Sequence, residues 1–323
     1  APAPAIDEAK MHDMAIKMVT ELGAAAMGSL VITGEKLGLY RELAKAATDS
    51  AGLAERAGCD ERYVREWLSA NAASGYVEYD DATGLFSMTP EQQWIFANPE
   101  SPFLMTGGYL SIRSLYVDEP RLTKAFRTGS GVSWGDHDSC LFCGVAKFFK
   151  PSYQNHLVQD WLPSLEGATE KLERGARVAD VGCGHGLSTL IMAEAYPDSS
   201  FVGYDIHEPS IVEARQLARE RGISNVQFEV AAAKEIPGRD WDLVTMFDCL
   251  HDMGDPAGAA AHVRTTLADG GSLMVVEPMA QDELAQNMNP VGRVYYAFST
   301  TVCTPCSLSQ EVGAALGAQA GQA

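Results

Sequence analysis

The stretch VADVGCGHG, residues 178–186, decides the fold of this chain. An apolar strand pattern carries the acid Asp180, and glycine then stands at every second position of a loop, at Gly182, Gly184 and Gly186. Glycine is needed where the backbone takes a positive φ or approaches a ligand closely. A helical pattern follows, and in open α/β sheets such a loop lies at the carboxyl edge, where ligands bind. The stretch therefore predicts a ligand-binding loop in an α/β domain.

The spacing of the glycines predicts the kind of ligand. It is G-x-G-x-G rather than the dinucleotide pattern G-x-G-x-x-G. Asp180 would repel a pyrophosphate, whereas a cationic amino-acid ligand would be attracted to it. Asp205 ends the next strand pattern, 19 residues beyond Gly186. An ionised carboxylate there can accept hydrogen bonds from both hydroxyls of a ribose.

Strand and helix patterns alternate from residue 177 onward. The expected strands are Arg177–Val181, Ser200–Tyr204, Val226–Val230, Trp241–Phe247 and Ser272–Val276. The expected helices are Leu187–Ala195, Ser210–Arg221 and Ala257–Leu267. This alternation predicts a parallel sheet with helices on both faces.

The N-terminal part has a different pattern. Residues 6–32 form one amphipathic helix, with an apolar face that predicts core or dimer packing: Met11, Met14, Met18, Leu22 and Ala25. Three shorter helices are expected at Lys36–Ala46, Ser50–Ala57 and Glu61–Ser74, and a hairpin at Tyr76–Tyr79 and Leu85–Met88. Asp60 is the expected N-cap of the third, whose inward residues are Tyr63, Val64, Trp67 and Leu68. A helix-turn-helix followed by a hairpin describes a winged helix.

Charge argues against nucleic acid as a partner. The chain has 24 Lys+Arg and 43 Asp+Glu, a net charge of −19. Residues 35–90 hold 6 basic and 10 acidic residues, a net of −4, and Glu61 and Glu66 offset Arg62 and Arg65 on the third helix. A dimer contact or a lid is the favoured role of this module. The alternative is a regulator that binds DNA through it.

Composition and hydropathy predict a globular protein of the cytoplasm. The chain is 46% apolar and 21% charged, which excludes a disordered chain, a collagen and a coiled coil. The longest apolar run, Leu22–Ile32, is too short to span a bilayer, and no signal peptide is expected. The seven cysteines are interpreted as reduced thiols.

These motifs together resemble the class I S-adenosylmethionine-dependent methyltransferases, in particular the two-domain bacterial, actinobacterial-type enzymes that act on small molecules. The resemblance implies a Rossmann-like α/β sheet and an N-terminal α-helical winged-helix domain. It implies a winged-helix domain for dimerisation or as a lid at 1–95, a helical connector at 96–165 and a cofactor-binding domain at 166–323. The family sheet ends with two more strands, and the sequence after Leu308 predicts no such hairpin. We therefore expect a truncated or incomplete chain.

The resemblance also implies a set of residues that bind S-adenosyl-L-methionine. The glycine loop would hold the methionine half, Asp205 the ribose and Ile206 the adenine. The family often has an acid after the third strand, but residues 230–234 read VAAAK, so backbone groups near Ala232 are expected to recognise adenine. The implied cofactor residues are Asp180, Gly182, Cys183, Gly184, Gly186, Asp205, Ile206, Ala232 and Asp248.

The segment DCLHDMGD, residues 248–255, resembles the L-H-D-W-x-D segment of the family's O-methyltransferases, with Met253 in place of Trp. In those enzymes the His deprotonates the acceptor hydroxyl, which implies that His251 is the general base and Glu277 its orienting carboxylate. The alternative is that His251 only caps or packs the loop. Methyl transfer to nitrogen, sulfur or carbon also stays open. His185 is assigned to the cofactor side or the entrance, and the remaining histidines are taken as structural: His12, His137, His156, His207 and His262.

Two further features leave alternatives open. The pairs Cys140/Cys143 and Cys303/Cys306 could hold zinc, but they are far apart in the sequence, and buried apolar thiols are the favoured interpretation. No metal is expected. The aromatic segment Asn287–Ser307 predicts either the wall of an acceptor pocket or helix packing. A nicotinamide-dependent oxidoreductase is the remaining rival, and the glycine spacing opposes it.

Overall fold

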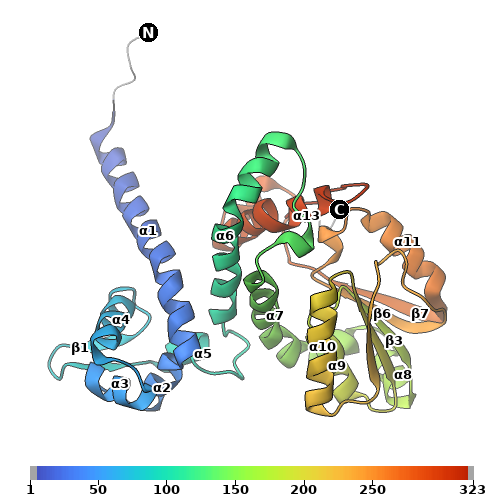
Figure 1. The fold of residues 1–323 in the computed structure, drawn as a ribbon, viewed down its shortest axis with the longest axis horizontal. Coiled ribbons are helices and arrows are strands. Elements are labelled where there is room, and N and C mark those ends of the chain that lie inside the picture. The colour runs from blue at the N-terminus through green and yellow to red at the C-terminus, as the bar shows by residue number, and fades with distance from the viewer. Residues whose placement is uncertain (1–5, 319–323) are drawn as a thin grey trace, which may run out of the picture. The chain divides into compact units, whose positions relative to one another are not determined.

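The computed structural model describes residues 6–318 and divides the chain into two compact units, residues 1–113 and 114–323 (Figure 1). The boundary falls inside helix α6, Thr106–Thr128. It therefore lies within the segment for which the sequence predicts a helical connector, and the finer division into three parts stays a prediction.

The first unit is the predicted helix-turn-helix with a hairpin. Its elements are α1 Glu8–Leu37, α2 Leu39–Lys45, α3 Ser50–Ala57, α4 Glu61–Ala73, β1 Glu78–Asp80, β2 Leu85–Ser87 and α5 Pro90–Phe96. The second helix begins at Leu39 rather than Lys36, because α1 continues to Leu37 and Gly38, with φ 71°, separates the two helices. Strands β1 and β2 pair antiparallel, and Thr48 adds a bridge to Phe86.

Helix α4 confirms its predicted cap and most of its predicted buried face. The side chain of Asp60 accepts from the backbone N–H groups of Arg62 and Tyr63. Val64, Trp67 and Leu68 are buried in the core of the first unit, but Tyr63 is 80% exposed, so its predicted inward position was wrong. The buried residues follow helical spacing, and Tyr63 lies one position outside that stripe.

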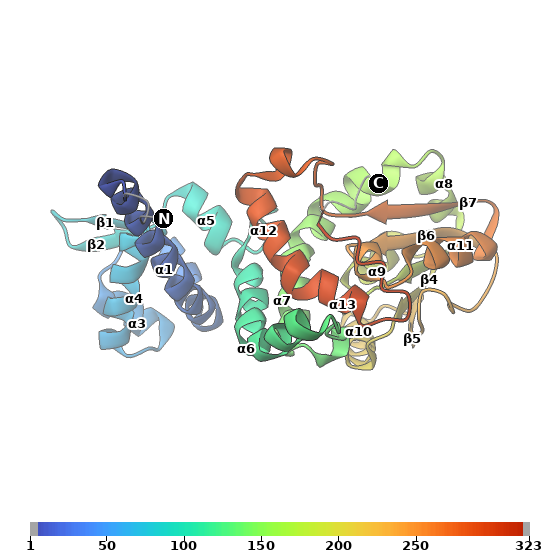
Figure 2. The same cartoon turned by 90° about the horizontal axis from the view of Figure 1, so that it is seen from above.

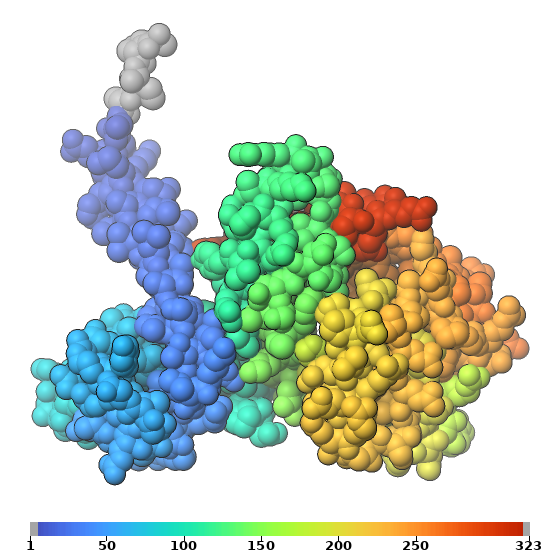
Figure 3. Space-filling view, viewed as in Figure 1, coloured from blue at the N-terminus to red at the C-terminus, as the bar shows by residue number. Residues whose placement is uncertain are grey.

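The first half of α1 is not part of a core. Met11, Met14, Met18 and Leu22 are 50–66% exposed, so the interpretation as core packing was wrong for this chain by itself. Figure 3 shows this half of the helix, in dark blue, standing free of the rest of its unit. By length and composition α1 could cross a membrane, with a mean hydropathy of 1.5 over 18 residues. Its last part, from Met27, packs in the first unit.

The second unit contains a five-stranded parallel sheet with the order β5-β4-β3-β6-β7 (Figure 2). The strands are β3 Arg177–Val181, β4 Ser200–Asp205, β5 Val226–Val230, β6 Trp241–Phe247 and β7 Leu267–Val276. All five predicted strands are present, with β4 one residue longer and β7 starting five residues earlier than predicted. Because β3 is central and β4 and β6 flank it, the loops after these three strands meet at one edge.

Helices cover both faces of this sheet, as predicted. They are α8 Ala168–Arg174, α9 Leu187–Ala195, α10 Glu208–Arg221 and α11 Pro256–Thr266. Val178 and Phe201 pack with residues of α8 and α9, while Ala179 and Val244 on the opposite face pack with Val263 of α11. Within residues 6–318 no strand follows β7, so β5 and β7 are the sheet edges.

The second unit contains further helical segments outside the sheet and its covering helices. They are η1 Trp134–Asp136, α7 Cys140–Ser152, η2 Tyr153–Trp161, η3 Leu162–Ser164, η4 Leu250–Asp252, η5 Leu284–Asn287, α12 Pro290–Phe298, η6 Ser299–Cys303 and α13 Thr304–Leu308. Segments η2 and η6 are π-helical, a geometry often found at functional sites. Both η4 and η6 contribute side chains to the candidate site.

Candidate functional site

The glycine loop after β3 has the backbone that its sequence predicts. Gly182, Gly184 and Gly186 all have positive φ, at 74°, 53° and 73°. A Cβ on Gly182 would lie 2.6 Å from Cys249 Sγ, and one on Gly186 would lie 2.5 Å from the Phe228 ring. A Cβ on Gly184 would meet nothing within 4 Å. The loop is therefore packed at both ends and open at its middle.

Asp180 is fully enclosed by protein. Its side chain accepts hydrogen bonds from Ser188 (2.7 Å), Thr189 (2.6 Å) and Thr245 (2.8 Å). Burial raises the pKa of this carboxyl, and the three hydroxyl bonds oppose that rise. Asp180 therefore joins β3 to α9 and to β6, a role that the sequence did not predict. Its predicted contact with the methionine half of a cofactor stays a prediction.

Asp205 lies beside the glycine loop, as the strand order requires. It accepts from the backbone N–H of Gly184 at 2.8 Å through one oxygen and from that of His207 at 2.8 Å through the other. Burial raises its pKa and these two hydrogen bonds lower it, with a net rise. Each carboxylate oxygen keeps a lone pair for a ligand. Ile206 follows with 55% of its surface exposed.

Glu277, directly after β7, organises the loop that carries His251. One oxygen of Glu277 accepts from the backbone N–H groups of Cys249 (3.3 Å) and Leu250 (2.8 Å). The other oxygen is hydrogen-bonded to His251 Nδ1. The structure thus brings the predicted base and its orienting carboxylate into contact. Cys249 donates its thiol to Val181 O at 3.2 Å, which places this loop against the end of β3.

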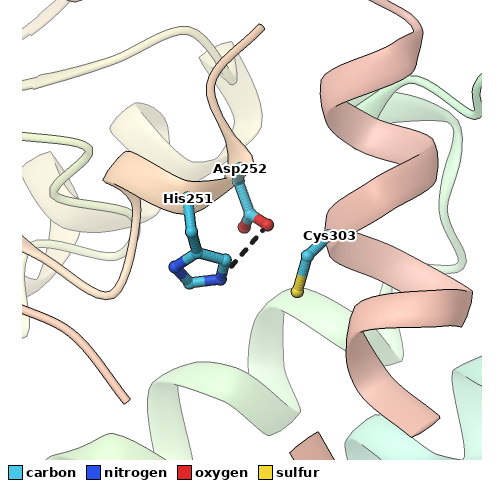
Figure 4. A group of neighbouring side chains, drawn as sticks. All are labelled: His251, Asp252 and Cys303. Carbon is cyan, nitrogen blue, oxygen red and sulfur yellow. Dashed lines mark ion pairs between the residues drawn. The ribbon is translucent and has the colours of Figure 1, made fainter. Parts of the chain in front are cut away.

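The other nitrogen of His251 faces two side chains that the sequence did not single out for the site. Nε2 lies 3.3 Å from Asp252 Oδ1. Figure 4 shows His251 and Asp252 on one loop, with Cys303 of η6 facing them from a separate helical segment. Burial lowers the pKa of His251, but hydrogen bonds with Cys303 and Glu277 and the charge of Asp252 raise it to about 12. In the site without a ligand, the imidazole therefore carries a proton on both ring nitrogens and a positive charge at neutral pH.

Asp248 stands at the end of β6 with a positive φ of 53°, which is uncommon for a residue other than glycine. Its backbone N–H donates to Val276 O at 2.8 Å. Burial raises the pKa of its carboxyl well above the usual value. Burial likewise raises the pKa of Tyr153, with the charge of Asp248 adding to the rise. A carboxylate oxygen of Asp248 lies within 4.8 Å of ligand atoms of His251 and Glu277, so Asp248 belongs to the same site.

The His251 loop is also hydrogen-bonded by α13 and the residues that follow it. The side-chain amide of Gln310 donates to Asp252 O at 2.9 Å and accepts from Gly254 N at 2.8 Å. Ser307 donates to Met253 O at 2.9 Å. The segment that predicted either a pocket wall or helix packing therefore packs on this loop and also brings Cys303 to His251.

Two groups of side chains are close enough to share one cation, and both contain His251. They are His251, Asp252 and Cys303, and Asp248, His251 and Glu277. Since both ring nitrogens of His251 already face carboxylates, hydrogen bonding and ion pairing account for this clustering. All seven cysteines are free thiols. Cys306 is buried as predicted for a packing residue, but Cys143 is exposed, so the interpretation as a buried thiol was wrong for Cys143. The predicted absence of a metal stays a prediction.

Two family models match the chain. Residues 172–316 match a model described as a methyltransferase domain, and residues 25–97 match one described as an Rv2258c-like winged helix-turn-helix domain. The first match covers the parallel sheet and the His251 loop, and the second covers the helix-turn-helix and its hairpin. The predicted family resemblance is thereby confirmed for both parts.

Curated relatives match about a third to a half of the chain. The ubiquinone biosynthesis O-methyltransferase of Bordetella avium is 28% identical over 172 residues, 52% of this chain and 64% of the relative. The aklanonic acid methyltransferase DauC of Streptomyces sp. strain C5 is 35% identical over 108 residues, 32% of this chain and 49% of the relative. The chain thus spans about half to two thirds of these relatives.

Solved structures match over nearly the whole chain. An O-methyltransferase family protein from Burkholderia thailandensis has a TM-score of 0.64 at 16% identity, covering 94% of this chain and 88% of the other. Human N-acetylserotonin methyltransferase, solved with S-adenosylmethionine, has a TM-score of 0.62 at 16% identity over the same shares. At this identity the matches establish the fold, and the predicted fold class is confirmed.

Proposed function

This chain carries a class I S-adenosylmethionine-dependent methyltransferase domain and an N-terminal winged-helix domain, and from that premise we propose that it methylates a hydroxyl group of a small molecule. The observation that carries the proposal is the Glu277–His251 pair. The loop that carries His251 contacts the end of β3, beside the glycine loop. The O-methyltransferases among the relatives support the choice of oxygen.

The residues around the glycine loop fit S-adenosylmethionine. The open middle of the loop at Gly184 leaves room for a ligand, and Asp205 beside it keeps lone pairs for the ribose hydroxyls. A carboxylate at Asp205, beside the loop, favours a cationic ligand over a pyrophosphate. The cofactor supplies a methyl group bonded to a positively charged sulfur.

His251 acts as the general base in this proposal. Glu277 holds Nδ1, so the proton of the acceptor hydroxyl goes to Nε2, the atom that faces Asp252 and Cys303. A base must be neutral, whereas the pKa of about 12 keeps the imidazole charged in the free site. A positive charge bound nearby lowers the pKa of His251 by repulsion. Base formation is therefore coupled to cofactor binding.

A screen of hydroxylated, amine and thiol acceptors tests the reaction. The formation of S-adenosylhomocysteine is followed, and the methylated atom is identified by mass spectrometry and NMR. We expect methyl transfer to oxygen. Transfer to nitrogen, sulfur or carbon alone would contradict the proposal for oxygen while leaving the methyltransferase assignment intact.

The alternative, a cofactor-sensing regulator that binds DNA, has little support at α4. Arg65 is paired with Glu61 through bonds of 2.9 and 2.7 Å, and Arg62 with Glu66 at 2.5 Å. These arginines are engaged with carboxylates of their own helix, so they are poorly placed to neutralise phosphates. A mobility-shift series at low salt that detects no DNA binding is the expected result.

We also propose that the chain forms a homodimer through the exposed half of α1. Met14 and Met18 belong to an apolar face that is half or more exposed in the single chain. Burying such a face in a second copy removes apolar surface from water. Light scattering at micromolar concentration should show a dimer, and the double variant Met14→Lys/Met18→Lys should be a monomer. A monomeric wild-type protein would contradict this proposal.

A further inference from the structure

The second unit contains another carboxylate–imidazole pair, formed by Asp118 of α6 and His137 after η1. Asp118 Oδ2 lies 3.0 Å from His137 Nδ1. The side chains are 5% and 1% exposed. The pair repeats the arrangement of Glu277 and His251, in which a carboxylate holds Nδ1 and leaves Nε2 for another partner. From the sequence, His137 was interpreted as a structural residue.

The partners of Asp118 fix the tautomer of His137. Asp118 also accepts from the backbone N–H of Asp138 at 3.0 Å and from Arg121 at 2.6 Å. Arg121 balances the charge of the carboxylate, which can only accept hydrogen bonds when it is ionised. Nδ1 of His137 therefore carries the proton, and Nε2 presents a lone pair.

This lone pair is buried without a partner. His137 Nε2 makes no hydrogen bond to any residue among positions 6–318. Buried polar side-chain atoms almost always have a partner, and an exception calls for a bound water or ligand. The same holds for Asp252 Oδ1, which lies within ion-pair distance of His251 but has no hydrogen bond.

His137 borders the acceptor side of the candidate site. Val132 N donates to Pro305 O at 2.9 Å, and a Cβ on Gly131 would lie 2.1 Å from that same oxygen. The segment before His137 therefore packs directly on α13, which follows Cys303. His137 is also close to Asp252: a charged imidazole at this position would lower the pKa of that carboxyl, against the larger effect of burial.

We propose that His137 Nε2 binds a second hydroxyl group of the acceptor, and that the substrates are small molecules with at least two hydroxyls. This inference rests on the proposed function. The first hydroxyl lies at His251 Nε2 and loses its proton there, and the second donates a hydrogen bond to His137. A buried lone pair accepts from a hydroxyl but gains nothing from a carbonyl or a carboxylate. An analogue that lacks the second hydroxyl leaves Nε2 unpaired and is discriminated against.

Matched pairs of phenolic compounds test the inference by binding. The pairs are catechol with phenol, quercetin with kaempferol, and 1,8-dihydroxyanthraquinone with 1-hydroxyanthraquinone. Dissociation constants are measured by calorimetry with the full chain saturated with S-adenosylhomocysteine. We expect at least one dihydroxy compound to bind the wild type about 10-fold or more tightly than its partner. The variant His137→Gln should abolish that preference.

The control variant is His156→Gln, which removes the histidine of an exposed pair with Asp160, 2.7 Å apart. It should keep the preference. The inference is overturned when no pair distinguishes wild type from His137→Gln, or when the variant weakens both members of each pair equally. If the wild type prefers a dihydroxy compound over its partner but transfers a methyl group to no acceptor, the result counts against the proposed function alone.

A measurement on the wild-type chain tests the inference even if the variant His137→Gln does not fold. With ¹⁵N-labelled histidine, the Nε2 resonance of His137 should move when the preferred dihydroxy compound is added and stay in place with its monohydroxy partner. Equal shifts with both compounds, or none with either, would show that Nε2 holds only a water molecule, which contradicts the inference.

Discussion

The two halves of the candidate site are built by different means. In the cofactor half, backbone N–H groups and neighbouring hydroxyls satisfy the carboxylates of Asp205 and Asp180. In the acceptor half, the charged side chains of Glu277, His251 and Asp252 face one another. Backbone donors fix a geometry without adding a charge that titrates, whereas facing side chains shift one another's pKa values.

This difference separates binding from chemistry. A change in the cofactor half should weaken cofactor binding or the fold. A change in the acceptor half should alter the rate and its pH dependence. Variants matched across the two halves test whether binding and chemistry separate in this way.

The largest effect is expected from His251→Ala. Removing a general base lowers the turnover rate by about 10²- to 10⁴-fold, while the affinity for S-adenosylhomocysteine should change little. Initial rates with the acceptor found in the screen and calorimetry measure the two quantities. His156→Ala, at an exposed histidine, is the control. An unchanged rate in His251→Ala would leave this residue only a packing role.

Asp205→Asn should act on binding instead. Hydrogen bonds to a charged group contribute about 1.5–3 kcal/mol, so the dissociation constant of S-adenosylhomocysteine should rise about 10- to 100-fold. Asp198→Asn, an exposed acid just before the other end of β4, is the matched control. If both variants bind the cofactor product equally well, Asp205 does not hold the ribose.

Thr245→Val should lower stability without touching chemistry. The hydroxyl of Thr245 is fully buried and donates to Asp180. Its removal should reduce the free energy of unfolding by about 1–3 kcal/mol, measured in urea. Thr33→Val, at an exposed position of α1, should cost less than about 0.5 kcal/mol. Equal losses in the two variants would mean that the hydrogen bond from Thr245 to Asp180 does not stabilise the packing of β6 beside β3.

Glu277→Gln should change the pH dependence of the rate. The base form of His251 appears as pH rises through its pKa, so the rate rises with pH on an acid limb. Glu277 helps to raise that pKa, and removing its charge should shift the limb by about 1 to 3 units toward lower pH. The maximal rate should fall, because the imidazole loses its orientation.

Profiles of kcat with cofactor in excess show this shift, and Glu283→Gln, at an exposed acid before η5, should leave the limb in place. A limb that stays in place in Glu277→Gln, or moves to higher pH, would contradict the assignment of the base.

The cofactor half could be predicted from the sequence because it is local. Gly182, Gly184 and Gly186 reveal their positive φ by residue type, and Asp205 follows from strand order. The strands of the sheet and the helices α9, α10 and α11 that cover it were predicted within a few residues, since apolar periodicity and the glycines between elements determine their bounds.

The acceptor half could only be predicted in part. The family motifs indicated His251 and Glu277. Asp252, Cys303 and His137 come together from three separate segments, and no local sequence pattern predicts that they lie close in space. The exposed face of α1 shows a different limit of prediction from sequence. Its helical period was predicted correctly, but a period alone does not say what covers a face.

Calorimetric titration of the full chain tests the central claim, that the glycine loop and Asp205 bind a sulfonium nucleoside. S-adenosylmethionine and S-adenosylhomocysteine should each bind at one site per chain, and NADH should give no heat. Tight binding of NADH together with no binding of either sulfur compound would contradict the account.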